Sequence, residues 1–123
     1  LRLKFLINRN VTVGIVIADS RLMPTRIGTI GVAIASSGFE PVEDERGKKD
    51  LFGNVLRVTF RAVADGLAAT GVAIMGEGSE SIPAVVVRGF RVTPTDRKLS
   101  KHDMAIDPEQ DIYIRGLKQP PKI

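Results

Sequence analysis

Short apolar runs rich in β-branched residues are separated by polar turns along this chain. Residues 11–18 and 83–89 are almost entirely apolar, and residues 30–35 are a further apolar segment. Runs of this length, bounded by Gly, Asp, Ser or Pro, are typical of buried strands. Residues 39–42 predict a short additional strand. The pattern therefore predicts a sheet.

Three other segments have the spacing of helices. Residues 1–8 alternate apolar and basic residues as in the last turns of a helix, which Asn10 can end. From residue 55 to 75, apolar positions recur on one face. Asp107 and Pro108 have the residue types of a cap and a first position, and so predict a short C-terminal helix.

Together these elements predict an α+β fold, a mixed or antiparallel sheet with packed helices. The 123 residues suffice for one domain with a core. Because residues 1–8 resemble the end of a helix without its beginning, we expect residues 1–123 to be one domain that is part of a larger fold. Residues 91–107 are expected to be irregular, and residues 117–123 to form a frayed tail.

Composition narrows the class of protein. Hydrophobic residues make up 43% of the chain and charged residues 26%, as in soluble globular proteins. No apolar run approaches the roughly 20 residues that span a bilayer, and there is no cysteine for disulfides or thiolate metal sites. We therefore expect a cytoplasmic protein with no membrane partner.

The net charge of +4 fits a nucleic acid or a small anionic ligand. The chain has five Phe, one Tyr and no Trp, which are few aromatic residues for stacking on single-stranded bases. Its basic residues are also spread along the sequence. We therefore expect small anions, and not nucleic acid, as partners.

Residues 44–54 combine six charges of both signs with two glycines and the apolar pair Leu51 and Phe52. This composition predicts a loop that is packed at one end and presents charge at the other, a common setting for binding residues. An ordinary polar hairpin turn fits the same composition.

Two acidic positions are candidates for metal binding. Asp19 ends an apolar run and is followed by Ser20, and their oxygens suit magnesium or manganese. Glu77 has a glycine on each side, which allows the backbone of the loop to approach a phosphate closely. A local turn at Asp19 and a surface turn at Glu77 are the alternatives.

Arg26, Arg46 and Lys49 are candidate cations for phosphate or carboxylate groups. Taken singly, each has the alternative of being a solvated surface residue. The only histidine, His102, lies in a polar stretch and is expected at the surface.

Several motifs in fixed order resemble one family. The order is an apolar strand ending in D-S, then P-x-R-x-G, V-A-I, G-x-E-P-x-E-D-x-R-G-x-x-D-L-F-G, A-V-A-D, and M-G-E-G followed by I-P-A-V-V-V-R-G. The resemblance is to the coenzyme F-420:L-glutamate ligase family and extends from about Val11 to Gly89. These enzymes add γ-linked glutamates to a deazaflavin cofactor precursor.

The resemblance implies a ligase that uses GTP and a divalent cation, manganese or magnesium, and in addition a monovalent cation. It would activate a carboxylate as an acyl phosphate, which the amine of L-glutamate then attacks. The implied metal ligands are Asp19, Ser20 and Glu77, where Ser20 matches a family threonine, and Asp19 and Glu77 are the implied catalytic residues. The implied nucleotide-binding residues are Met75, Gly76, Glu77, Gly78, Ser79, Glu80, Ser81 and Ile82.

The chain also departs from the family. Many relatives have an aromatic residue and an arginine near Thr25 and Ile27, and an Asp at the position of Gly31. Family members carry a comparably large further N-terminal portion, so residues 1–123 are expected to be a single domain or a fragment, the C-terminal half of such a ligase, and to be incomplete and inactive alone. A homodimer is implied by the resemblance. The alternative is a non-catalytic nucleotide-binding or assembly module derived from the same fold.

Overall fold

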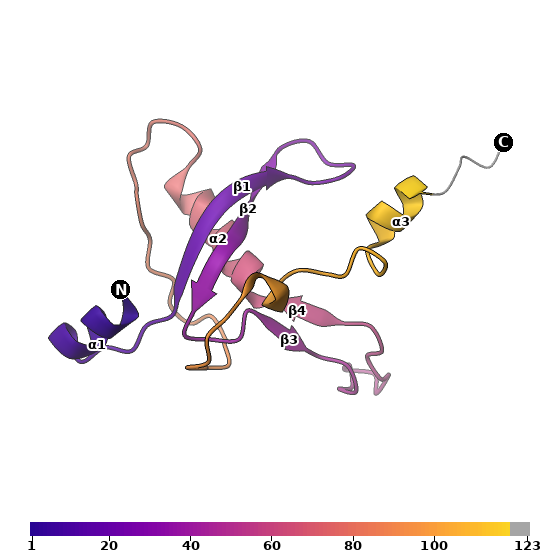
Figure 1. Ribbon diagram of the computed structural model, residues 1–123, viewed down its shortest axis with the longest axis horizontal. Coiled ribbons are helices and arrows are strands. Elements are labelled where there is room, and N and C mark those ends of the chain that lie inside the picture. The colour runs from indigo at the N-terminus through magenta and orange to yellow at the C-terminus, as the bar shows by residue number, and fades with distance from the viewer. Residues whose placement is uncertain (119–123) are drawn as a thin grey trace.

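The computed structural model describes residues 1–118 as an α+β fold with two small antiparallel sheets (Figure 1). The fold class predicted from the sequence is therefore confirmed. In chain order the elements are α1 (Arg2–Arg9), β1 (Ile15–Leu22), β2 (Thr29–Ser37), β3 (Val42–Asp44), β4 (Phe60–Ala62), α2 (Val63–Met75), the 3-10 helix η1 (Lys101–Asp103) and α3 (Ile112–Lys118).

Strands β1 and β2 form the larger hairpin, and helix α2 packs across one of its faces (Figure 1). The register pairs Ser20 with Gly31 and Leu22 with Thr29, with an irregularity between Ile17 and Ala18. Helix and strand come unusually close at Gly31, where a Cβ atom would lie 2.4 Å from the carbonyl oxygen of Ala68. Glycine at this position is therefore what allows α2 to pack directly on β2.

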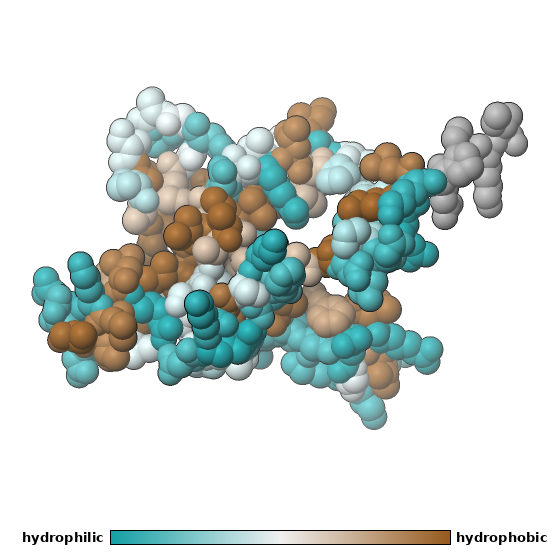
Figure 2. Space-filling model, in the orientation of Figure 1, coloured by the Kyte–Doolittle hydropathy of each residue, from teal (hydrophilic) through white to brown (hydrophobic). Residues whose placement is uncertain are grey.

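The core is small and is centred on Phe39 and the first residues of α2. Within residues 1–118 the buried apolar side chains are those of Phe39, Pro41, Val63, Ala64 and Ala68. The chain exposes 10212 Å² to solvent, whereas a compact protein of this mass exposes about 6,500 Å². Apolar side chains consequently make up much of the visible surface (Figure 2). Partly buried residues around the core are Val16, Ala33, Leu67, Val92 and Met104.

Helix α1 is confirmed together with its predicted end. Asn10 adopts the left-handed conformation with φ of 51° and donates its backbone N–H to the carbonyl of Leu6, and the N–H of Val11 donates to the carbonyl of Phe5. Arg2 joins α1 to the rest of the fold by donating to Ser37 Oγ at 3.3 Å and by pairing with Asp96 at 2.6 Å.

The predicted strands differ from the observed ones in position and burial. Strand β1 begins at Ile15 and continues to Leu22, so residues 11–14 precede it. It is half-exposed and Ile17 is 59% exposed, because only one face of a two-stranded hairpin is covered by α2. The apolar segment 30–35 lies within β2, as expected. In the predicted strand 39–42, Phe39 forms only an isolated bridge with Pro94, and β3 begins at Val42.

The helix predicted over residues 55–75 was too long at its start. Residues 55–62 are the returning arm of the second hairpin, which includes β4, and α2 begins only at Val63. Backbone hydrogen bonds from Gly47 to Leu56 and from Glu45 to Thr59 hold this arm against the preceding one. Pairing with a neighbouring strand has overridden the helical spacing.

The strand predicted over residues 83–89 was wrong. This segment is extended but belongs to neither of the sheets found in residues 1–118, and most of its side chains are exposed. Val85 and Val87 are half-buried, whereas Val86 between them is 79% exposed. Exposed and half-buried positions therefore alternate at Val85, Val86 and Val87 as in a strand, but no strand within residues 1–118 pairs with this segment.

Residues 91–107 are irregular, as expected, apart from η1, which Ser100 and Asp103 close with reciprocal hydrogen bonds. The predicted C-terminal helix exists but starts later, at Ile112. Asp111 caps it by accepting from the N–H groups of Tyr113 and Ile114, whereas Asp107 caps a preceding turn. Of the predicted tail, residues 117 and 118 lie in α3, and residues 119–123 lie outside the described part of the chain.

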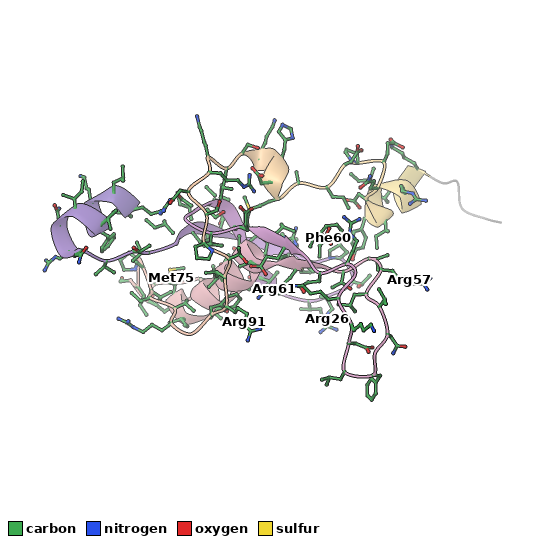
Figure 3. The ribbon with its side chains drawn as sticks, turned by 90° about the horizontal axis from the view of Figure 1, so that it is seen from below. Arg26, Arg57, Phe60, Arg61, Met75 and Arg91 are labelled. Atoms are coloured by element: carbon green, nitrogen blue, oxygen red, sulfur yellow. The ribbon has the colours of Figure 1, made fainter. Side chains whose placement is uncertain are left out.

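The charged segment 44–54 forms the projecting end of the β3–β4 hairpin (Figure 3). The expectation that its apolar pair packs against the protein was wrong, because Leu51 is 99% and Phe52 89% exposed. Asp50 holds the tip in shape by accepting from the N–H groups of Phe52 and Asn54. At the base of the hairpin the Arg46 guanidinium lies 4.5 Å from the centroid of the Phe60 ring, which is itself 52% exposed.

None of the helices within residues 1–118 combines the length and the apolar character needed to cross a membrane.

Candidate functional site

Glu77 is placed by the end of helix α2. The helix stops at Met75, and Gly76 turns the chain with φ of 82° while its N–H bonds to the carbonyl of Val72 at 2.9 Å. This conformation is unfavourable for residues with a side chain. The turn directs Glu77 toward the β1–β2 hairpin.

Ser20 connects Glu77 with Asp19. Its hydroxyl donates to Glu77 Oε2 at 3.0 Å, and its backbone N–H donates to Asp19 Oδ1 at 2.8 Å. Two carboxylates that are 58 positions apart by residue number, 19 and 77, are therefore bonded to the same residue. The structure therefore brings Glu77 to Ser20, whereas Asp19 is simply the neighbour of Ser20 in the chain, and no hydrogen bond within residues 1–118 joins Asp19 to Glu77.

The two carboxylates approach Ser20 from different sides. Ser20 lies opposite Gly31, the residue that meets α2, so its hydroxyl is on the helix-covered face with Glu77. Neighbouring residues of a strand face opposite sides, which directs the Asp19 side chain to the uncovered face. Its carboxylate bends back to the N–H of Ser20.

Thr29 is a polar contact of the site that the sequence did not suggest. Its hydroxyl donates to Glu77 Oε1 at 3.1 Å, so both oxygens of Glu77 accept a hydroxyl hydrogen bond. The available signal was a single hydroxyl residue directly before the apolar segment 30–35. Its role depends on the hairpin register, which the sequence did not indicate.

The donor set fits a hard divalent cation. Two carboxylates and one hydroxyl, from Asp19, Glu77 and Ser20, offer the oxygen atoms that magnesium and manganese prefer. Within residues 1–118 no cluster of three or more His, Cys, Asp or Glu side chains is arranged to hold a metal. A cation bound here would therefore need further oxygen ligands from water or from a phosphate.

The loop after Glu77 is stabilised mainly by its own groups. The N–H of Gly78 donates to Glu80 Oε2 at 2.8 Å, and Ser81 Oγ donates to the carbonyl of Ser79 at 3.3 Å. A Cβ at position 76 would lie 2.3 Å from Glu80 Cδ, so the carboxylate fills the space beside Gly76. The residues predicted to bind nucleotide, Met75 to Ile82, thus form the end of α2 and one contiguous exposed loop.

The three candidate cations lie in two places. Arg26 is in the turn between β1 and β2, which also joins Ser20 to Thr29, but Figure 3 shows it on the side of Phe60, away from Met75. Arg46 and Lys49 belong to the β3–β4 hairpin. No hydrogen bond or ion pair in the described part of the chain joins these three to Glu77.

Arg46 already has a partner. Its guanidinium binds both carboxylate oxygens of Asp44, with distances of 2.9, 3.1 and 2.6 Å. The contact lowers the pKa of Asp44 to about 2 and raises the pKa of Arg46. The charge of Arg46 is thus matched within its own hairpin.

An apolar cavity of about 500 Å³ borders the site. It lies between β1, α2 and the extended segment that follows residue 82, and Met75 is one of its walls. Other lining residues include Ile15, Ala18, Leu67, Gly71, Val85, Val87 and Phe90.

Sequence comparison defines the class of protein. The family model described as F420-0:Gamma-glutamyl ligase matches residues 1–89 of the 123. The chain therefore belongs to the F420-0:gamma-glutamyl ligase family, as its motifs predicted.

Curated relatives carry the name coenzyme F420:L-glutamate ligase. The protein of Archaeoglobus fulgidus is 41% identical over 107 residues, covering 87% of this chain and 42% of the relative. That of Methanocaldococcus jannaschii is 41% identical over 101 residues, covering 82% and 40%. The Methanococcus maripaludis C6 protein is 47% identical over 80 residues, covering 65% and 32%. This chain spans about two fifths of the length of the first two relatives.

Proposed function

We propose that this chain supplies metal-binding and phosphate-binding residues to a GTP-dependent ligase that joins L-glutamate, through a γ-linked amide, to a deazaflavin precursor of coenzyme F420. Membership of the family and the names of the relatives support the ligase reaction. The observation that carries the site is the Ser20–Glu77 hydrogen bond, which unites two motifs distant in sequence. Because the chain spans about two fifths of those relatives, the reaction is proposed for the complete ligase.

The proposed reaction has two steps. A carboxylate of the precursor accepts the terminal phosphoryl group of GTP, which gives an acyl phosphate and GDP. The amine of L-glutamate then attacks the acyl carbon, forms the amide bond and releases phosphate. Each step moves negative charge on phosphate oxygens, so catalysis depends on positioned positive charge.

Within this scheme Asp19, Ser20 and Glu77 would hold a manganese or magnesium ion, which offsets the charge on the phosphate oxygens. The loop 75–82 would bring backbone groups close to the nucleotide. Arg26, Arg46 and Lys49 would bind phosphate or the acidic tail of the substrate. Arg46 would first have to exchange Asp44 for the ligand, since the two are paired.

Binding is the first test. Calorimetric titration of the purified protein with GTP, with and without Mn²⁺, should give nucleotide binding that requires the cation. Glu77→Gln and Asp19→Asn should each weaken the Mn²⁺ affinity by about tenfold or more, since each replaces a charged ligand. Unchanged Mn²⁺ affinity in both variants would remove these residues from the site.

Turnover is the second test. The protein, in its full natural length, is incubated with the deazaflavin precursor, L-glutamate, GTP and Mn²⁺, and products are analysed by mass spectrometry. The expected product carries one or more additional glutamyl residues. Cation-dependent GTP binding without any product would instead support a non-catalytic nucleotide-binding module.

A further inference from the structure

Glu77 is held from two strands at once. Ser20 of β1 donates to Oε2 at 3.0 Å, and Thr29 of β2 donates to Oε1 at 3.1 Å. Thr29 pairs with Leu22, two residues beyond Ser20, so the register puts both hydroxyls on the face that α2 covers. The carboxylate therefore has a hydroxyl partner on each oxygen and a defined orientation.

We propose that Thr29 is a positioning residue that fixes the Glu77 carboxylate for a divalent cation. The assignment rests on the proposed function, in which Glu77 is a metal ligand. Glu77 lies in an exposed loop between Gly76 and Gly78, where the backbone by itself restrains the side chain little. Hydrogen bonds from the surrounding protein are what restrict such a carboxylate to one orientation.

The hydroxyls of Ser20 and Thr29 have different roles in this proposal. Ser20 follows Asp19 and offers its own oxygen to the cation, so its contact with Glu77 belongs to the ligand set. Thr29 is bonded to the other oxygen of Glu77 and acts on the cation only through that carboxylate. Partners that orient a ligand in this way typically contribute 10–100-fold to metal affinity.

The chain offers matched substitutions for this assignment. Thr29→Val keeps the shape of the side chain and removes the hydroxyl, whereas Thr29→Ser keeps the hydroxyl. Thr29 is exposed, so neither change creates a cavity. Thr70→Val is the control, because the Thr70 hydroxyl donates within α2 to the carbonyl of Gly66 at 2.8 Å, away from Glu77 in sequence and in bonding.

The experiment is a Mn²⁺ titration of the purified proteins followed by electron paramagnetic resonance, which counts free ion. Thr29→Val should bind Mn²⁺ about tenfold more weakly than the wild type. Thr29→Ser and Thr70→Val should bind within about twofold of it. As a readout without metal, hydrogen exchange of residues 76–80 should be faster in Thr29→Val only.

Three outcomes overturn the assignment. Equal Mn²⁺ affinity of the wild type and Thr29→Val removes Thr29 while leaving the metal site intact. Absence of Mn²⁺ binding in the wild type shows that the proposed metal site itself is wrong, and the role of Thr29 is rejected with it. Failure of Thr29→Ser to restore affinity also contradicts a role of the hydroxyl.

Discussion

The backbone N–H of Ala33 in β2 donates a 2.9 Å hydrogen bond to Oδ1 of Asp65 in α2. Ala33 lies beside the irregularity in the β1–β2 ladder, where Ala18 pairs with Ala33 and Ile17 with Ala35. Ile34 is therefore left without a partner in β1. A side chain of the helix thus satisfies a backbone group of the strand and ties the two elements together.

Replacing Asp65 tests that connection. Asp65→Ala should lower the free energy of unfolding by about 1–3 kcal/mol, because the partly buried N–H of Ala33 loses its acceptor. Asp65→Asn retains an acceptor oxygen and should cost less. Urea denaturation followed by circular dichroism measures both, and equal losses in the two variants would contradict the argument.

The close approach at Gly31 gives a second prediction. Gly31→Ala should destabilise the protein by about 1–3 kcal/mol, because the added Cβ would lie 2.4 Å from the Ala68 carbonyl oxygen and must displace α2. Gly116→Ala in α3 is the control, since nothing lies within 4 Å of its Cβ position. Thermal unfolding that ranks the two variants the other way would show that α2 adjusts freely.

Two phenylalanines in opposite environments give a third prediction. Phe39 is 2% exposed and belongs to the core, so Phe39→Ala should cost about 3–5 kcal/mol of stability. Phe52 is 89% exposed at the hairpin tip, so Phe52→Ala should change stability by less than about 0.5 kcal/mol. A large loss in Phe52→Ala, measured by the same denaturation, would mean that the tip is packed in solution.

The ion pair between Glu43 and Arg61 makes stability depend on pH. The guanidinium of Arg61 holds the pKa of Glu43 below its ordinary value, and the N–H of Thr93 also donates to this carboxylate at 3.0 Å. A carboxylate with a lowered pKa in the folded state stabilises the fold above its ordinary pKa. That stabilisation is lost as the pH falls through the lowered value.

The matching experiment compares urea midpoints between pH 7 and pH 3. The wild type should lose stability toward pH 3, and Glu43→Gln should have a flatter profile because its side chain does not titrate. Glu109→Gln, which removes an exposed pair with Lys118, should follow the wild type. A Glu43→Gln profile as steep as the wild type would assign the acid sensitivity to other groups.

Ser20 can be tested against threonine, the residue that the resemblance described above implies at this position in the family. Ser20→Thr retains the hydroxyl and should keep Mn²⁺ affinity within about threefold, whereas Ser20→Ala should weaken it by about tenfold or more. Titration with Mn²⁺ measures both. Comparable losses in both variants would indicate that the size of the side chain, and not its hydroxyl, matters at this position.

The sequence indicated the two strands of the first hairpin, though not their pairing, and it suggested the residues of the candidate site. β-branched apolar runs located β1 and β2 to within a few residues, and Asn10 marked the end of α1. Family motifs, and not spacing, suggested that Asp19, Ser20 and Glu77 act together. Contacts such as that of Thr29 with Glu77 arise only from strand register, which single-sequence patterns do not specify.

Two segments show why the local residue pattern was insufficient to predict the secondary structure. Residues 55–62 have apolar positions spaced as in a helix, but the facing arm of the hairpin pairs with them and makes them extended. Residues 83–89 have the residue pattern of a strand, yet no strand within residues 1–118 forms backbone pairs with them. In both cases the outcome depends on the presence or absence of a neighbour distant in sequence.

Helix α2 also acts as a spacer of fixed length between two anchor points. Asp65 bonds to β2 near its first turn, and Glu77 bonds to both strands just past its last. Inserting or deleting one residue between them would turn Glu77 by about 100° and shift it by about 1.5 Å along the axis. We therefore expect length changes in this stretch to abolish cation binding, while similar changes at the projecting tip near residue 52 are tolerated.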